Sequence, residues 1–378
     1  MCKKCDKWDK RIDRIRKKRY NNEVSKTKED VMGNTRKKIV ALVAAAAMSA
    51  TAITGCGKIN NEATLMTVGE DKVTMGVGNF FARYQQAMAE AQYGTYMGDE
   101  MWETEVAESE TMEESMKKRI LESLKTLYVL EDHMKDYKVE LTAEEKQKIE
   151  TTAKEFLKAN KDGAKEVISA DEDTVKRVLE LLTIEDKMRE AMVKDVDKNV
   201  SDEEAAQKSM QYVFFTFTKT AEDGTSTTID DSAKKELKEK ATKFQEGAKS
   251  QADFAAYAKA SGYEATTKTF DAKDTAPSED LIKAVDKLKA GEMTGVIETP
   301  SGYYVAKVIS LLDRAATDAE KKTIIAEREN KKYEELVDKF VKDAKIDVNK
   351  NEWKKISFSK QRITLKAVEQ KTEQQEQK

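Results

Sequence analysis

Cysteine, proline and histidine are scarce in this chain of 378 residues, and each scarcity excludes some classes of fold or functional site. The three cysteines, Cys2, Cys5 and Cys56, all lie near the N-terminus, so no disulfide can cross-link the rest of the chain. Cys2 and Cys5 have the spacing of half a zinc site, but no second pair follows. We therefore expect no metal and no cofactor.

The one histidine, His133, is expected to be a surface or interfacial side chain on a helix. No nucleophile motif accompanies it, and glycine-rich phosphate loops are absent from the sequence. These absences argue against a triad hydrolase and against a nucleotide enzyme. The chain has only two prolines and long runs of Ala, Glu, Lys and Leu, which favour helix over strand.

Charge divides the chain at Cys56. Residues 1–55 contain 15 Lys and Arg against 6 Asp and Glu, whereas the remainder contains 53 basic and 65 acidic side chains. An acidic body argues against nucleic acid as a partner. We interpret the acidity as solvated helix faces that keep a surface protein soluble.

The first 55 residues contain the layout of a secretory signal. Arg36, Lys37 and Lys38 precede an apolar or small run of about 15 residues that ends at Ile53, and small residues follow before Cys56. The run is too short to cross a bilayer comfortably as a permanent helix. We interpret residues 32–55 as a signal peptide that is cut off before Cys56, and residues 1–31 as an upstream extension that is not part of the native protein.

The cleavage site carries a second signal. The segment Ile53-Thr54-Gly55-Cys56 resembles the lipobox of bacterial lipoproteins, in which small residues precede a cysteine that receives lipid. The resemblance implies lipid attachment at Cys56, an anchor and spacer over residues 56–62, and a protein held on the extracytoplasmic face of the cell membrane. Two or more acyl chains, which the resemblance also implies, anchor a protein stably.

The body begins with a mainly helical region over residues 63–200. We expect two short strands around the turn Gly69-Glu70-Asp71, a helix from Asn79, and irregular chain from Gly94 to Ser109. Further helices are predicted over residues 112–137, 142–159 and 171–196, with a capping box from Thr142 to Glu145. Seven methionines crowd the first part of this region. We favour core packing for them over an adaptable client surface; they are Met66, Met75, Met88, Met97, Met101, Met112 and Met116.

A different pattern starts after a second capping-box sequence, Ser201 to Glu204. Residues 211–218 are β-branched and aromatic, which predicts the first long strand. Alternating helix and strand signals continue to residue 314 and predict a small α+β domain with a four-stranded antiparallel sheet. Residues 317–358 return to a helical pattern, and the polar tail over residues 359–378 is predicted to be disordered.

This order of segments resembles the PrsA-type foldase lipoproteins and their SurA relatives. The most specific stretches are Leu288-Lys289-Ala290-Gly291-Glu292 and Gly302-Tyr303-Tyr304-Val305, which look like the helix exit and last strand of a parvulin-type (PpiC-type) prolyl isomerase domain. The resemblance implies that residues 63–200 and 317–358 form one split chaperone module. The parvulin-like domain, residues 201–314, is inserted between its two parts.

The sequence departs from the parvulin pattern at the active site. Parvulins carry one histidine in the first strand and another after Gly-Tyr in the last strand, and the matching positions here are Phe214 and Tyr304. Leu281 replaces a phenylalanine of the family's pocket, and Phe270 completes the set of candidate peptide-binding residues. No residue is assigned a catalytic role, so we expect a degenerate site with weak or absent isomerase activity.

The function expected from the sequence is a membrane-anchored foldase or chaperone that binds unfolded, newly exported polypeptides. An active peptidyl-prolyl cis-trans isomerase is the first alternative. A solute-binding lipoprotein is the second, although such a protein should alternate strands and helices around a cleft. The sequence leaves open whether the protein forms a homodimer.

Overall fold

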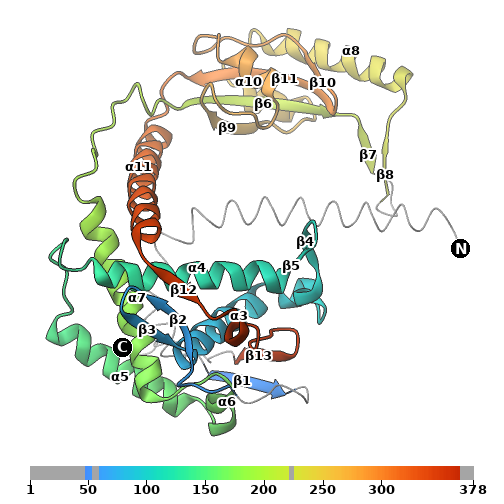
Figure 1. Ribbon diagram of the computed structural model, residues 1–378. Coiled ribbons are helices and arrows are strands. Elements are labelled where there is room, and N and C mark those ends of the chain that lie inside the picture. Colours follow the sequence, from blue (N-terminus) through green and yellow to red (C-terminus); the bar gives the residue numbers. More distant parts are fainter. Residues whose placement is uncertain (1–46, 53–58, 221–224, 367–378) are drawn as a thin grey trace, which may run out of the picture. The chain divides into compact units, whose positions relative to one another are not determined.

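The computed structural model describes residues 47–52, 59–220 and 225–366. By its internal contacts the chain divides into two compact units. Unit 1 contains the described residues up to Asp195 and from Lys332 onward, and unit 2 spans Val196 to Lys331. Helix α11 (Arg314–Asp343) begins in unit 2 and ends in unit 1 (Figure 1). This division falls inside α11, whereas the sequence analysis put a domain boundary before that helix.

Unit 1 is mainly helical. Besides the C-terminal part of α11, its helices are α3 (Met75–Met97), α4 (Met112–Asp132), α5 (Ala143–Ala159), α6 (Asp162–Val167), α7 (Glu172–Val193), α12 (Lys350–Trp353) and the 3-10 helix η1 (Met101–Glu103). Its strands are β1 (Ala47–Ala52), β2 (Thr64–Val68), β3 (Asp71–Thr74), β4 (Glu105–Ala107), β5 (Glu110–Thr111), β12 (Ile346–Val348) and β13 (Gln361–Lys366).

The helix starts follow local capping chemistry. Thr142 forms the predicted capping box with Glu145, and Thr111 forms another with Glu114. The predicted start of the first helix at Asn79 is wrong, because the hydroxyl of Thr74 accepts a hydrogen bond from the Val77 N–H and begins α3 at Met75.

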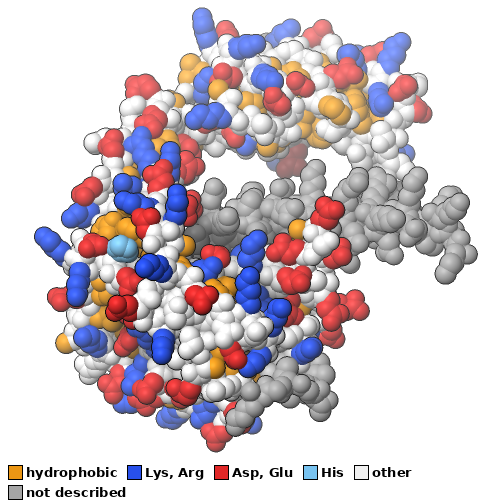
Figure 2. Space-filling model, in the orientation of Figure 1, with side chains coloured by type: hydrophobic (Ala, Val, Ile, Leu, Met, Phe, Trp, Pro, Cys, Tyr) orange, Lys and Arg blue, Asp and Glu red, His pale blue; other side chains and the backbone are white. Residues whose placement is uncertain are grey.

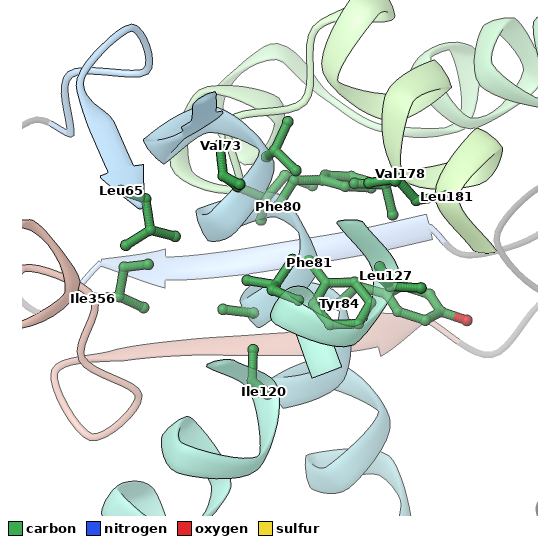
Figure 3. Packing of buried hydrophobic residues seen from close by; sticks show 14 of the residues in the cluster. Leu65, Val73, Phe80, Phe81, Tyr84, Ile120, Leu127, Val178, Leu181 and Ile356 are labelled. Carbon is green, nitrogen blue, oxygen red and sulfur yellow. The ribbon is translucent and has the colours of Figure 1, made fainter. Parts of the chain in front are cut away.

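Residues near the C-terminus complete the core of unit 1, although the rest of that core lies far earlier in the sequence. Strand β12 pairs with β2, which also pairs with β3, giving a three-stranded sheet with the order β12-β2-β3. Beyond β12, Ile356 and Phe358 are fully buried, and the ring of Phe358 lies 4.9 Å from that of Trp102. Figure 3 shows Ile356 beside Leu65 of β2. All seven methionines are buried in this core or pack against it, which confirms the core interpretation.

The prediction of a disordered tail from residue 359 is wrong as far as Lys366. Residues 361–366 form β13, with Gln361 and Ile363 buried. Buried side chains of α3 bind the backbone here: Arg83 Nη1 donates to the carbonyl oxygens of Ser357 (3.0 Å) and Gln361 (3.3 Å), and Gln86 Nε2 donates to that of Gln361 (2.6 Å). A polar sequence is ordered because buried polar partners on another helix satisfy its backbone.

The predicted leader falls mostly outside the described residues. The predicted cleavage site and the predicted lipid attachment at Cys56 lie outside the described residues, as do Cys2 and Cys5. One part of the predicted apolar run is described: residues 47–52 form β1, which pairs antiparallel with β13. Within the described parts of the chain, no helix combines the length and apolar character needed to cross a membrane.

Unit 2 contains the predicted four-stranded antiparallel sheet, which confirms the α+β, mainly helical fold class. Its strands are β6 (Lys208–Thr216), β9 (Thr266–Phe270), β10 (Ile297–Thr299) and β11 (Gly302–Ser310), in the order β10-β11-β6-β9, and a separate hairpin joins β7 (Thr218–Thr220) to β8 (Ser226–Thr228). Its helices are α8 (Asp231–Ala248), α9 (Phe254–Ala260), α10 (Glu279–Val285) and the N-terminal part of α11.

The second capping-box sequence does not start a helix. The Glu204 N–H donates to Ser201 Oγ at 3.1 Å, but residues 201–207 remain a turn and extended chain. Asp202 instead forms ion pairs with Arg314 (2.8 Å) and Lys321 (2.6 Å) of α11. These two cations lower the pKa of the Asp202 carboxyl below its usual value.

Candidate peptide-binding site

Strands β6 and β11 bring two of the predicted site residues face to face. Phe214 and Tyr304 are direct cross-strand partners in the antiparallel register. Their ring centroids are 4.4 Å apart with 25° between the ring planes, a stacked arrangement. The two side chains, which the sequence predicts to replace the parvulin histidines, therefore form one continuous aromatic surface.

The alternation of β6 separates two cores. Val213 and Phe215 point to the face covered by α8 and α9, where Phe244 and Phe254 complete a cluster. Met210 packs on the opposite face, which α10 covers. Because side chains alternate along a strand, Phe214 shares that opposite face with Met210.

Of the four candidate residues, one is exposed to solvent and three are buried. The side chain of Phe214 is 36% exposed, that of Tyr304 is 5% exposed, and those of Phe270 and Leu281 are fully buried. Tyr304, Phe270 and Leu281 belong to one core cluster. A peptide can contact Phe214 directly, whereas Phe270 and Leu281 lie beneath Tyr304 as support.

Tyr212 is a member of this surface that the sequence analysis did not identify. Its ring meets the ring of Tyr304 edge-on, with centroids 5.6 Å apart and 63° between the planes. The period-two spacing of Tyr212 and Phe214 on one strand was the available signal. Three aromatic rings thus line this part of the sheet.

Gly302 fixes the position of the exposed ring. A Cβ atom at this position would lie 2.3 Å from the Phe215 carbonyl oxygen and 2.5 Å from Cε2 of Phe214. Only glycine lets the start of β11 approach β6 this closely. The Gly-Tyr-Tyr sequence therefore sets both the strand pairing and the place of the Phe214 ring.

The chemistry available at this surface is mainly apolar. Burial, and to a lesser extent the neighbouring Tyr212, raises the pKa of the Tyr304 hydroxyl above its usual value. The hydroxyl is therefore neutral at physiological pH and can donate one hydrogen bond. His133, the chain's only histidine, belongs to unit 1, where it stacks on Phe340 at 3.9 Å and bonds Asp136 at 2.7 Å. Its contacts agree with the structural role expected for it.

A family model provides the deciding comparison. Residues 218–322 match the PPIC-type PPIASE domain. This segment of the chain is similar to a PPIC-type domain. Tyr304 lies within the matched residues, whereas Phe214 lies just before them, on β6. The match confirms the parvulin-type resemblance of this segment.

Solved structures similar to the chain include foldases and chaperones. The foldase PrsA from Streptococcus pneumoniae is 18% identical, with 79% of this chain and 99% of that chain covered and a TM-score of 0.29. The peptidylprolyl isomerase PrsA from Bacillus cereus is 16% identical, with coverages of 78% and 97% and a TM-score of 0.30. A SurA-like chaperone from Campylobacter jejuni is 10% identical, with coverages of 76% and 99% and a TM-score of 0.27. No curated protein sequence gives a significant match.

Proposed function

We propose that the protein is a membrane-anchored extracytoplasmic chaperone for newly exported polypeptides, and that its PPIC-type domain binds apolar peptide with little or no isomerase activity. One observation carries the second half of this proposal: Phe214 and Tyr304, which the sequence resemblance aligns with the parvulin histidines, stack on each other. The family match supports a peptide-binding domain of this type.

The aromatic surface can contribute little to the chemistry of prolyl isomerisation. The uncatalysed reaction crosses a barrier of about 18–20 kcal/mol, and a catalyst must stabilise the twisted imide. Preorganised polar groups achieve this kind of stabilisation. Phe214 offers none, and Tyr304, a residue that is 5% exposed, offers one hydroxyl. Flat aromatic rings do offer apolar contact area, which favours binding over catalysis.

The charge of the molecule supports polypeptide clients over nucleic acid. On the face shown in Figure 2, Lys and Arg side chains are interspersed with Asp and Glu over the described residues. Such a mixed surface keeps a chaperone soluble without committing it to one charge class of partner. It lacks the single-signed field that nucleic-acid binding requires on that face.

The anchor rests on the sequence at Cys56, the sole acceptor in the proposed lipobox. Substitution Cys56→Ala should release the protein from the membrane fraction or stall its processing. Unchanged membrane retention with normal cleavage would contradict the anchor.

The chaperone function is tested by aggregation of an unfolded client, followed by light scattering. The protein should suppress aggregation at a near-stoichiometric ratio. Phe214→Ala should weaken binding of an apolar, proline-containing peptide several-fold, because the exposed ring is lost. Ile309→Ala is the matched control, since Ile309 is an exposed apolar residue of β11 outside the ring cluster. No suppression by the wild-type protein would refute the proposal.

A further inference from the structure

Strand β13 has only one partner in the described part of the chain, and that partner is a segment of the predicted signal. Residues 47–52 of β1 pair antiparallel with residues 361–366 of β13, from Ala47 opposite Lys366 to Ala52 opposite Gln361. In Figure 3 the two strands run side by side behind the core residues. A cut before Cys56 separates β1 from the body.

The site on β13 beside Asn160 that β1 occupies, here called the seat, holds an extended segment and buries the side chain of Met48. Met48 is 4% exposed and belongs to the core cluster of unit 1 together with Ile363 of β13. The Met48 N–H donates to Oδ1 of Asn160 at 2.6 Å. Asn160 is itself buried at the end of α5, where its Nδ2 donates to the Phe156 carbonyl oxygen at 2.7 Å. Asn160 Oδ1 is therefore oriented to accept a hydrogen bond from a backbone N–H of a strand that pairs with β13.

Contacts that do not involve β1 also hold the seat in place. Gln86 and Arg83 of α3 hold the carbonyl oxygen of Gln361, and Arg362 forms an ion pair with the buried Glu90 at 3.2 Å. Ile363 is fully buried in the core of unit 1. Removal of β1 would leave the strand fixed, its outer backbone groups unpaired, and the site of the Met48 side chain vacant.

We propose that this seat, on β13 beside Asn160, receives an extended apolar segment of a client polypeptide by strand addition, and that β1 occupies it in the uncleaved chain. An unpaired strand edge with a side-chain pocket is a recurrent way of binding extended peptides. Backbone pairing gives affinity for many sequences, while the Met48 pocket selects an unbranched apolar side chain. The inference rests on the proposed function, because the seat opens only if the leader is removed.

The probe is a labelled, end-blocked peptide with the β1 sequence AMSATA, and its binding is followed by fluorescence anisotropy. Three forms of the protein are compared: the uncleaved chain, the uncleaved chain with Met48→Asp, and the processed protein with the leader removed. Met48→Asp places a charge in the core and should displace β1. The Met48→Asp chain and the processed protein should each bind the peptide at least tenfold more tightly than the uncleaved wild-type chain. Equal binding, or no binding, by all three forms overturns the proposal.

Peptide variants identify the mode of binding without risk to the fold of the protein. A peptide with an N-methyl group on the methionine nitrogen cannot donate to Asn160, and a peptide with aspartate in place of methionine cannot fill the pocket. Each should bind the processed protein at least tenfold more weakly. Equal binding of the N-methylated peptide would overturn strand addition.

Aggregation suppression by the same processed sample separates this inference from the proposed function. Suppression without peptide binding refutes the seat and leaves the chaperone function intact. Peptide binding without suppression supports the seat and refutes the chaperone function. Failure of both measurements overturns both.

Discussion

The two units build their cores in opposite ways. In unit 2 the sheet and its covering helices come from one continuous stretch, from Lys208 to Ser310. In unit 1 the strands near the N-terminus pair with β12 and β13, which lie after the whole of unit 2 in the sequence. Unit 2 can therefore complete its core from local chain, whereas unit 1 is complete only when its C-terminal segment has returned.

The units also differ in what they bury. Unit 1 buries a polar network in which Asn79, Arg83, Gln86 and Glu90 of α3 are all at most 8% exposed. Unit 2 concentrates aromatic rings on both faces of its sheet. Directional hydrogen bonds specify one partner, the C-terminal segment, while stacked rings tolerate many sequences. In unit 1 the polar network holds the chain's own C-terminal segment, and in unit 2 the stacked rings form the surface that we propose binds client peptide.

Deletion of the returning segment should have the largest effect. A chain that ends at Ala344 lacks β12, β13 and the buried side chains of Trp353, Ile356 and Phe358. Each large apolar side chain contributes about 1.5–3 kcal/mol, and domains are stable by only about 5–15 kcal/mol. Calorimetry should show loss of the unit 1 transition and retention of the unit 2 transition. A chain that ends at Lys366 is the control and should keep both transitions. A unit 1 transition that survives in the chain that ends at Ala344 would contradict the comparison.

Arg83→Ala tests the polar network alone. Arg83 is 1% exposed and donates to Gln86 Oε1 (2.7 Å) as well as to the carbonyl oxygens of residues 357 and 361. Removing one partner of a buried charged network costs about 3–5 kcal/mol. Urea unfolding should show this loss for unit 1 only. Arg119→Ala, at an exposed position on α4, should change the free energy of unfolding by less than about 0.5 kcal/mol.

Gly302→Ala should destabilise unit 2 instead. The new Cβ would lie 2.3 Å from the Phe215 carbonyl oxygen, so the β6–β11 pairing must shift. Forced overpacking of this kind costs up to about 3 kcal/mol. Thermal melting should show a lower midpoint for unit 2 and an unchanged midpoint for unit 1. Gly295→Ala is the matched control, because a Cβ atom there would meet nothing within 4 Å.

Glu113 should give the smallest effect, and one that depends on pH. Burial raises its carboxyl pKa, but hydrogen bonds from Ser359 and Phe358 and the charge of Lys117 outweigh burial and lower the pKa below the usual value. A carboxyl whose pKa is lowered by folding stabilises the folded state above its unfolded pKa, about 4.3. This stability is lost as the pH falls through the folded pKa.

The melting midpoint of unit 1 should therefore decrease below about pH 4.3, and Glu113→Gln should reduce that dependence. At neutral pH the substitution should cost about 1 kcal/mol, the scale of a lost hydrogen bond. Glu108→Gln, at an exposed position between β4 and β5, is the control. An unchanged pH profile in the Glu113 variant would show that this carboxylate does not hold the C-terminal segment.

Sequence patterns predicted the parts of the fold that depend on local chemistry. The capping box at Thr142, the turn at Gly69 and the four strands of unit 2 each follow from residues close together in the chain. The meeting of Phe214 and Tyr304 was also predictable, because the resemblance placed both at the paired positions of one sheet.

The features that sequence patterns did not predict depend on contacts between residues far apart in the chain. Residues 361–366 read as a polar tail, yet Arg83 and Gln86 order them from 275 or more residues away. The full burial of Phe270 and Leu281 likewise depends on the packing of α10 against the sheet, which no local pattern specifies. Single-sequence periodicity cannot reveal such pairings, because it records only neighbours along the chain.

A proline-limited refolding reaction tests the central claim most directly. The central claim is that unit 2 binds apolar peptide through the exposed ring of Phe214, which stacks on Tyr304, with little or no isomerase activity. With catalytic amounts of the protein, the slow phase of a client should stay within about twofold of its spontaneous time of tens to hundreds of seconds. Substantial acceleration at catalytic amounts, abolished by Phe214→Ala or Tyr304→Ala, would contradict the claim and show an active isomerase without histidine.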